Sequence, residues 1–217
     1  MLFNWLRRGD PYPRALYDSV VAQARQPAFY AVLGVPDTLD GRFDMIVMHL
    51  SAVIDRMRNP DRTVDQHGQN LFDCFVEDME QNLRQMGVGD LSVPKRMKKI
   101  GQAFYGRFGA YTHAEGELDL AAAIGRNVFP EEGEVRPAAR ALARDYAAAR
   151  AAVEAVDEAR LLEGRIDWPA VPDLSDVAAI PPAAPPAGGV AEDLDGERPF
   201  RAIADETVSD KPAAGGR

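Results

Sequence analysis

The sequence predicts an all-α protein, a single bundle of six to seven helices followed by a disordered acidic C-terminal tail. Apolar residues recur at spacings of three and four through most of residues 12–162, which is the period of a helix with one buried face. No segment shows the apolar–polar alternation that is typical of a half-buried strand. With 217 residues, of which 46% are hydrophobic, the chain suits one domain plus a tail.

The first eleven residues are expected to form a short N-terminal arm before the helical domain. Trp5 lies in an apolar stretch that runs directly into Arg7 and Arg8. An aromatic side chain beside two arginines suits contact with a membrane surface. The alternative is a frayed terminus that docks Trp5 on its own domain. Trp5, Arg7 and Arg8 are therefore the candidate residues for membrane contact.

The first half of the domain predicts three helices. Residues 12–33 form two of them, because Pro27 interrupts the apolar pattern. Asp37 or Thr38 can cap the helix that follows. That helix, over residues 42–58, is apolar on more than one face, so we expect it at the centre of the bundle.

The segment around which the domain is organised is a basic helix that follows an acidic one. Residues 64–86 predict a long helix with an acidic outer surface, and Gly87 and Gly89 end it. From Ser92 to Gly109 the chain has no acidic residue, although its net charge is −9. The basic residues of this segment are Lys95, Arg96, Lys98, Lys99 and Arg107. Because the link is short, the two helices should be neighbours.

The start and the buried face of the basic helix can also be predicted. Ser92 is the expected N-cap, and Pro94 is tolerated in the first turn. Tyr105 points away from the apolar stripe, where it would face a partner. The stripe itself consists of Met97, Ile100, Phe104, Phe108 and Tyr111.

The C-terminal half predicts two more helices and then the tail. Residues 117–128 form one helix, and an alanine-rich helix covers residues 137–162. The helical domain therefore extends over residues 12–168. Residues 169–217 are rich in proline, alanine and acidic residues and lack periodicity, which is typical of a disordered segment.

Four stretches of the sequence, taken together and in their order, resemble the ubiquinol–cytochrome c chaperone family. The hallmark run is GVGDLSVPKRMKKIGQAFYGR, which includes the basic helix. The resemblance covers roughly residues 12–168. The other three stretches are LYDSVVAQARQPAFYAVLGVPDTLDGRFDMIVMHL, LFDCFVEDMEQNLRQMGVGD and LAAAIGRNVFP.

The resemblance implies an assembly chaperone for ubiquinol–cytochrome c reductase. Such a protein would bind newly made cytochrome b, the translating ribosome, or both, and would carry no cofactor. The family's mitochondrial members work with a second, smaller assembly factor, so a partner of that kind is also implied. Because this chain starts almost directly with its domain, we expect a bacterial, cytoplasmic protein acting at the inner face of the inner membrane.

No pattern in the sequence predicts catalysis, and we expect that the protein is not an enzyme. His49, His67 and His113 lie in different segments, and His49 stands in the apolar central helix, as a core histidine would. Cys74 faces an apolar run and is interpreted as a small core residue. No phosphate-binding loop, dinucleotide fingerprint, CxxC or HExxH motif occurs. Catalytic, cofactor-binding and metal-binding residues are therefore all predicted to be absent.

Two surfaces are candidates for binding a partner. The first is the basic helix, with Tyr105. It is either a solvated face that pairs with the acidic helix or the site of an anionic partner, such as RNA or lipid headgroups. A protein that used this face alone would be an RNA- or ribosome-binding module without client-holding activity, which is the alternative function.

The second surface is an apolar groove, for which flexible methionines are suited. Most of the candidate methionines are expected to be plain core; they are Met45, Met48, Met57, Met79, Met86 and Met97.

Overall fold

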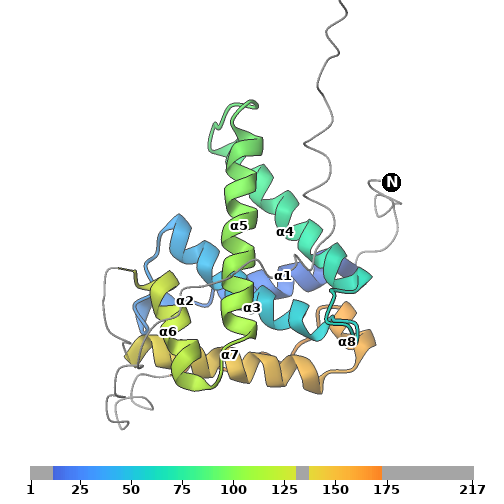
Figure 1. Ribbon diagram of the computed structural model, residues 1–217, viewed down its shortest axis with the longest axis vertical. Helices are drawn as coiled ribbons and strands as arrows, with labels where there is room; N and C mark the ends of the chain where they lie inside the picture. Colours follow the sequence, from blue (N-terminus) through green and yellow to red (C-terminus); the bar gives the residue numbers. More distant parts are fainter. Residues whose placement is uncertain (1–11, 131–136, 173–217) are drawn as a thin grey trace, which may run out of the picture.

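The computed structural model describes residues 12–130 and 137–172, and their only regular secondary structure is helical (Figure 1). The all-α prediction is therefore confirmed. The helix predicted over residues 137–162 is divided in two, because Asp157 caps a new helix by accepting a hydrogen bond from the backbone of Arg160. The predicted N-terminal arm, with Trp5, Arg7 and Arg8, and the predicted tail from residue 173 onwards lie outside the described residues. The helices are α1 (Tyr12–Ala24), α2 (Pro27–Ala31), α3 (Leu39–Arg56), α4 (Gln66–Gln85), α5 (Val93–Thr112), α6 (Glu117–Val128), α7 (Pro137–Ala155) and α8 (Glu158–Leu162).

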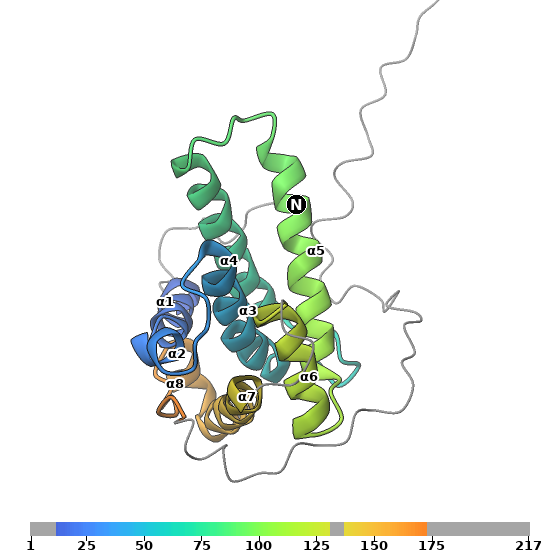
Figure 2. The same cartoon turned by 90° about the vertical axis from the view of Figure 1, so that its left-hand side faces the viewer.

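Helix α3 is the centre of the bundle, as its two-faced apolar pattern predicts. It packs against α1, α5 and α7, and more narrowly against α4 and α6. Figure 2 shows it between α1 and α5. Its N-terminus is capped by Thr38, whose hydroxyl accepts a hydrogen bond from the Gly41 backbone at 3.2 Å. The cap places the start of the helix at Leu39, three residues before the predicted start.

A buried polar pair joins α3 to α7. The Nε2 atom of His49 lies 3.2 Å from the Oδ2 atom of Asp145, and both side chains are fully buried. The other ring nitrogen of His49 lies 2.9 Å from the carbonyl oxygen of Met45. Trp168 packs edge-on against His49 and donates a hydrogen bond from its indole to Ser19 at 3.0 Å. His49 is thus the core histidine that the sequence predicts. Through its contact with Trp168, it helps to hold the C-terminal end of the domain on α1.

Helices α4 and α5 form a hairpin whose connected ends extend beyond the other helices (Figures 1 and 2). The two helices are in contact, as their short link predicts. Gly87 ends α4 with a left-handed backbone, φ 79°. The amide of Val88 donates to the carbonyl of Leu83, and that of Gly87 to the carbonyl of Arg84, which is the pattern of a Schellman motif. Ser92 precedes α5 as expected, but its side chain makes no capping hydrogen bond.

Candidate partner-binding hairpin

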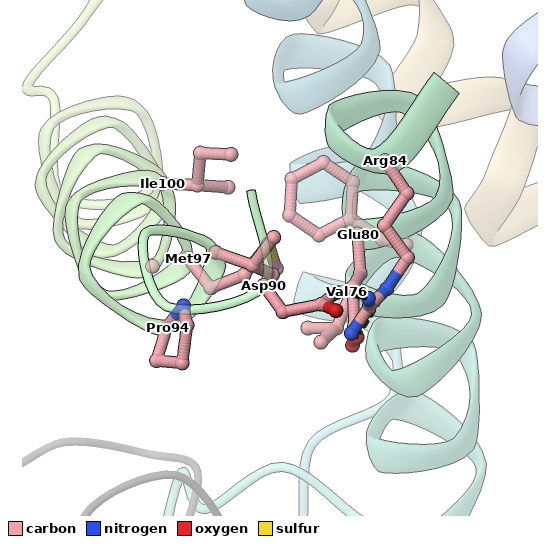
Figure 3. Close-up of a pocket in the computed structure, with 10 residues that line it drawn as sticks. Val76, Glu80, Arg84, Asp90, Pro94, Met97 and Ile100 are labelled. Carbon is pink, nitrogen blue, oxygen red and sulfur yellow. Dashed lines mark hydrogen bonds and ion pairs between the residues drawn. The ribbon is translucent and has the colours of Figure 1, made fainter. Parts of the chain in front are cut away.

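A groove of about 270 Å³ opens between α4 and α5 near their connected ends (Figure 3). Its walls come from both helices and from Asp90 in the link between them. Gly101 contributes to the space because it has no side chain, and no other atom fills the position that a Cβ would take there. The lining residues are Phe75, Val76, Glu80, Arg84, Asp90, Val93, Pro94, Met97, Ile100 and Gly101.

Most of the groove's wall is apolar and incompletely covered by the rest of the chain. Met97 and Ile100 of α5 lie across from Val76 of α4, and all three side chains are half-buried (Figure 3). Further from the tip the same helices pack tightly, because the rings of Phe72 and Phe104 are fully buried with their centroids 4.8 Å apart. The contact between α4 and α5 is therefore tightly packed at the base of the hairpin and accessible to solvent towards its tip.

One edge of the groove carries a small charged network. Arg84 donates a hydrogen bond to Glu80 at 2.7 Å and another to Asp90, so it connects α4 with the residues that lead into α5. The side chains of Arg84 and Glu80 are 49% and 42% exposed. Because water screens charges at such exposure, the network orients the tip more than it stabilises it.

Four of the predicted site residues form an exposed basic strip on α5: Lys95, Arg96, Lys98 and Lys99. Within the part of the chain that the structure describes, none of these four side chains forms an ion pair. The pairing with the acidic helix that one alternative expects is therefore absent among the described residues, and this face of α5 is solvated. Their positive charge is available to an anionic partner.

Arg107 and Tyr105 do not join the basic strip. The Nε atom of Arg107 donates a hydrogen bond at 2.6 Å to the nearly buried carboxylate of Asp44, and its guanidinium lies over the ring of Phe43. Burial raises the pKa of Asp44 to about 6, although the charge of Arg107 opposes that change. Tyr105 is half-buried, with its ring 5.8 Å from that of Phe72, rather than directed away from the bundle. Arg107 therefore holds the base of the hairpin on α3, and Tyr105 packs within the hairpin.

The candidate methionines divide between core and surface. Met45, Met48 and Met57 are buried, as expected for plain core residues. Met97 alone among the six lines the groove, while Met86 is exposed at the end of α4. The sequence did not single out Val76, Ile100 and Gly101 as groove residues. The signal available was that Ile100 belongs to the apolar stripe of the basic helix, close to the break that ends α4, and that Gly101 follows it directly.

Other candidate sites among the described residues differ from the groove in chemistry. None of its groups of His, Cys, Asp and Glu is placed to hold a metal ion. Cys74 is buried, as predicted, and burial raises the pKa of its thiol to about 11. A second hollow, of about 240 Å³, lies among charged side chains that include Arg56, His67 and Glu158.

Comparison with known proteins identifies the family. The model of the ubiquinol-cytochrome C chaperone family matches residues 31–168. Ubiquinol-cytochrome c reductase complex assembly factor 1 of Mus musculus is 28% identical over 178 residues, which cover 78% of this chain and 59% of the mouse protein. The Xenopus laevis protein of that name is 23% identical over 176 residues, or 78% of this chain and 86% of its own length. The chain thus spans less than two thirds of the mouse relative.

A solved structure is also similar. The crystal structure of the Cbp3 homolog from Brucella abortus matches with a TM-score of 0.67 and 34% sequence identity, over 79% of this chain and 98% of that chain. The family match covers more than half of the sequence and includes both helices of the hairpin. The chain therefore belongs to the ubiquinol–cytochrome c chaperone family.

Proposed function

We propose that the protein is an assembly chaperone for ubiquinol–cytochrome c reductase that binds newly made cytochrome b. Membership of the family and the names of the mouse and frog relatives support the assembly role. The observation that supports client binding is the apolar groove on the projecting hairpin. A membrane protein that has not yet inserted exposes apolar segments, and a groove of this kind shields them from water.

The shape and lining of the groove fit this role. Its volume of about 270 Å³ is below the range of roughly 300–1,000 Å³ that is usual for small-molecule pockets. It suits a few side chains of an apolar segment better than a cofactor. Met97 can adapt to different side chains, because its thioether side chain is unbranched and flexible. The proposed mechanism is therefore binding and release, without a bound cofactor.

The place of action follows from the client. We infer that the protein works in the cytoplasm, at the inner face of the bacterial inner membrane, before or during insertion of cytochrome b. A second, smaller assembly factor is a further proposed partner. Among the described helices, none combines the length and the apolar character needed to cross a bilayer.

A direct test combines two groove substitutions with a matched surface control. Cytochrome b is translated in a cell-free system with the full chain, and the fraction that co-purifies is measured. The Met97→Asp/Ile100→Asp variant should retain less than about a tenth of the cytochrome b, because a charge inside an apolar contact is costly to desolvate. Leu118→Asp changes an exposed apolar residue of α6 and should have no effect. Equal capture by all three proteins would refute the groove as the client site.

A test in cells addresses the assembly role itself. Deleting the gene should selectively lower the b-type haem signal of the reductase in difference spectra of membranes. Other respiratory complexes should be intact. A normal spectrum would contradict the proposed assembly role, whatever the groove binds.

The exposed basic strip favours one other function, an RNA- or ribosome-binding module without client-holding activity. Binding to ribosomes would then fall steeply with salt, since each phosphate contact releases condensed counterions. It would be lost when Lys95, Lys98 and Lys99 are replaced by glutamate. Capture of apolar segments through the groove should instead tolerate salt, and this difference separates the two functions.

A further inference from the structure

We propose that the tip of the hairpin, residues 86–92, docks on an anionic membrane surface. In this arrangement Leu91 enters the headgroup region, and lysines of the basic strip bind lipid phosphates. Leu91 is 99% exposed and Met86 52% exposed, so two large apolar side chains lie uncovered in the short segment that joins α4 to α5. This proposal concerns the opposite side of α5 from Met97 and Ile100, and it does not depend on what the groove binds.

The spacing of the lysines along α5 matches the thickness of a headgroup layer. Lys95, Lys98 and Lys99 lie within the first two turns behind the tip. Four residues of helix span about 6 Å, and each headgroup layer is roughly 5 to 7 Å thick. When Leu91 reaches the boundary of the acyl chains, Lys95 is the first lysine in the headgroup layer, and Lys98 and Lys99 lie about one helical turn further out. Their long aliphatic stems can reach along the helix to adjust that depth.

The charges elsewhere in the molecule favour an approach by the tip. The only acidic residue of the tip, Asp90, is paired with Arg84, so the tip presents little uncompensated negative charge. The whole chain carries a net charge of −9. The basic strip has the opposite sign to this net charge, which favours an approach of the hairpin to an anionic surface by its basic face.

Lipid explains these features better than RNA does. The phosphates of lipid and of RNA could both bind the lysines. Phosphate binding alone does not explain why an apolar residue is fully exposed beside them. Proteins that bind single-stranded RNA commonly stack bases on aromatic side chains. Residues 86–99 contain no aromatic residue. Apolar side chains next to lysines are, in contrast, the usual composition of a surface that binds anionic membranes.

The test is flotation of the full chain with vesicles. Vesicles of equal parts phosphatidylcholine and phosphatidylglycerol should bind it, and pure phosphatidylcholine should not. Lys95→Gln/Lys98→Gln should weaken binding about 30-fold, since each basic residue near such a surface contributes about fivefold. The matched control, Arg160→Gln/Arg165→Gln, removes the same charge at the exposed α8 end and should change binding less than about twofold.

A second measurement reports insertion of the tip. A Leu91→Cys variant can be labelled selectively with an environment-sensitive dye, because the single native cysteine, Cys74, is buried. The emission of the dye should shift to the blue on anionic vesicles and stay unchanged with single-stranded RNA. A dye that shifts with RNA and not with vesicles would overturn the proposal.

Truncation separates the hairpin from the other candidate for membrane contact. A chain without residues 2–11 lacks Trp5, Arg7 and Arg8 and should still bind anionic vesicles. Loss of binding in this variant, together with full binding by the lysine variant, would overturn the proposal and place the contact in the N-terminal arm. Met97→Ala, which changes the groove without changing charge, should bind anionic vesicles like the native chain, so the outcome is independent of the groove.

Discussion

The base and the tip of the α4–α5 hairpin are built from the same two helices and the same apolar stripes, yet they have different surroundings. At the base, Phe72 and Phe104 are fully buried against each other, and Phe108 stacks beyond them. At the tip, Met97 and Ile100 continue the stripe of α5 but are only half-buried. The comparison shows that apolar periodicity identifies a face that can be buried, whereas the neighbouring elements decide whether it is.

The largest expected effect comes from opening the base. Phe72→Ala should lower the free energy of unfolding by about 3 to 5 kcal/mol, because it removes a fully buried ring and leaves a cavity among the other aromatic rings. Met97→Ala, at the tip, should cost less than about 1 kcal/mol because its side chain is already partly in water. Urea unfolding of both variants measures the difference.

Equal losses for the two variants would refute the distinction between base and tip. Cytochrome b capture gives the matching functional comparison. Met97→Ala should weaken cytochrome b capture while leaving the fold stable. At the tip, a substitution should therefore change binding without a matching change in the free energy of unfolding.

The sequence predicts the hairpin well and the use of its surfaces less well. The helices, the stop at Gly87 and the contact between α4 and α5 depend on residues close together in the chain, and all are confirmed. The pairing of Arg107 with Asp44 joins residues 63 positions apart, so only the tertiary structure shows that this charge is occupied. The contact of Tyr105 with Phe72 of α4 likewise joins residues far apart in the chain, and it leaves the tyrosine half-buried.

A second prediction concerns the buried charge at the base. Burial raises the pKa of Asp44 from an ordinary 3.8 to about 6. In the window between these values the folded protein holds a proton that the unfolded chain has lost. The contribution of Asp44 to stability is therefore greatest in acid and is lost as the pH rises from about 4 to 6. The decrease should be about 2 to 3 kcal/mol.

The measurement compares the native protein with Asp44→Asn by urea unfolding at several pH values. The advantage of the native protein over the variant should fall through this window, and the comparison cancels the titration of the other carboxylates. If the advantage rose instead, the charge of Arg107 would outweigh the desolvation of Asp44. The ion pair between Arg107 and Asp44 would then stabilise the base of the hairpin.

A third prediction tests the turn that sets the tip apart. Gly87→Ala should destabilise the protein by about 1 kcal/mol, because alanine is strained at a φ of 79°. No atom lies within 4 Å of the position that a Cβ would occupy, so the cost should be conformational and not steric. Gly89→Ala, a control in the same loop without a left-handed backbone, should cost less. Similar losses for both would indicate that the whole loop, and not the Schellman motif, fixes the tip.

The smallest effect is expected at the exposed charges of the tip. Arg84→Ala removes the contacts with Glu80 and Asp90, and it should leave the free energy of unfolding almost unchanged, since solvent screens these pairs. Urea unfolding at low and high salt measures both the effect and its screening. A clear loss of stability at low salt that disappears at high salt would contradict this prediction. It would show that the tip, like the base, depends on a specific charge, and that the groove owes its shape to Arg84 rather than to the turn at Gly87.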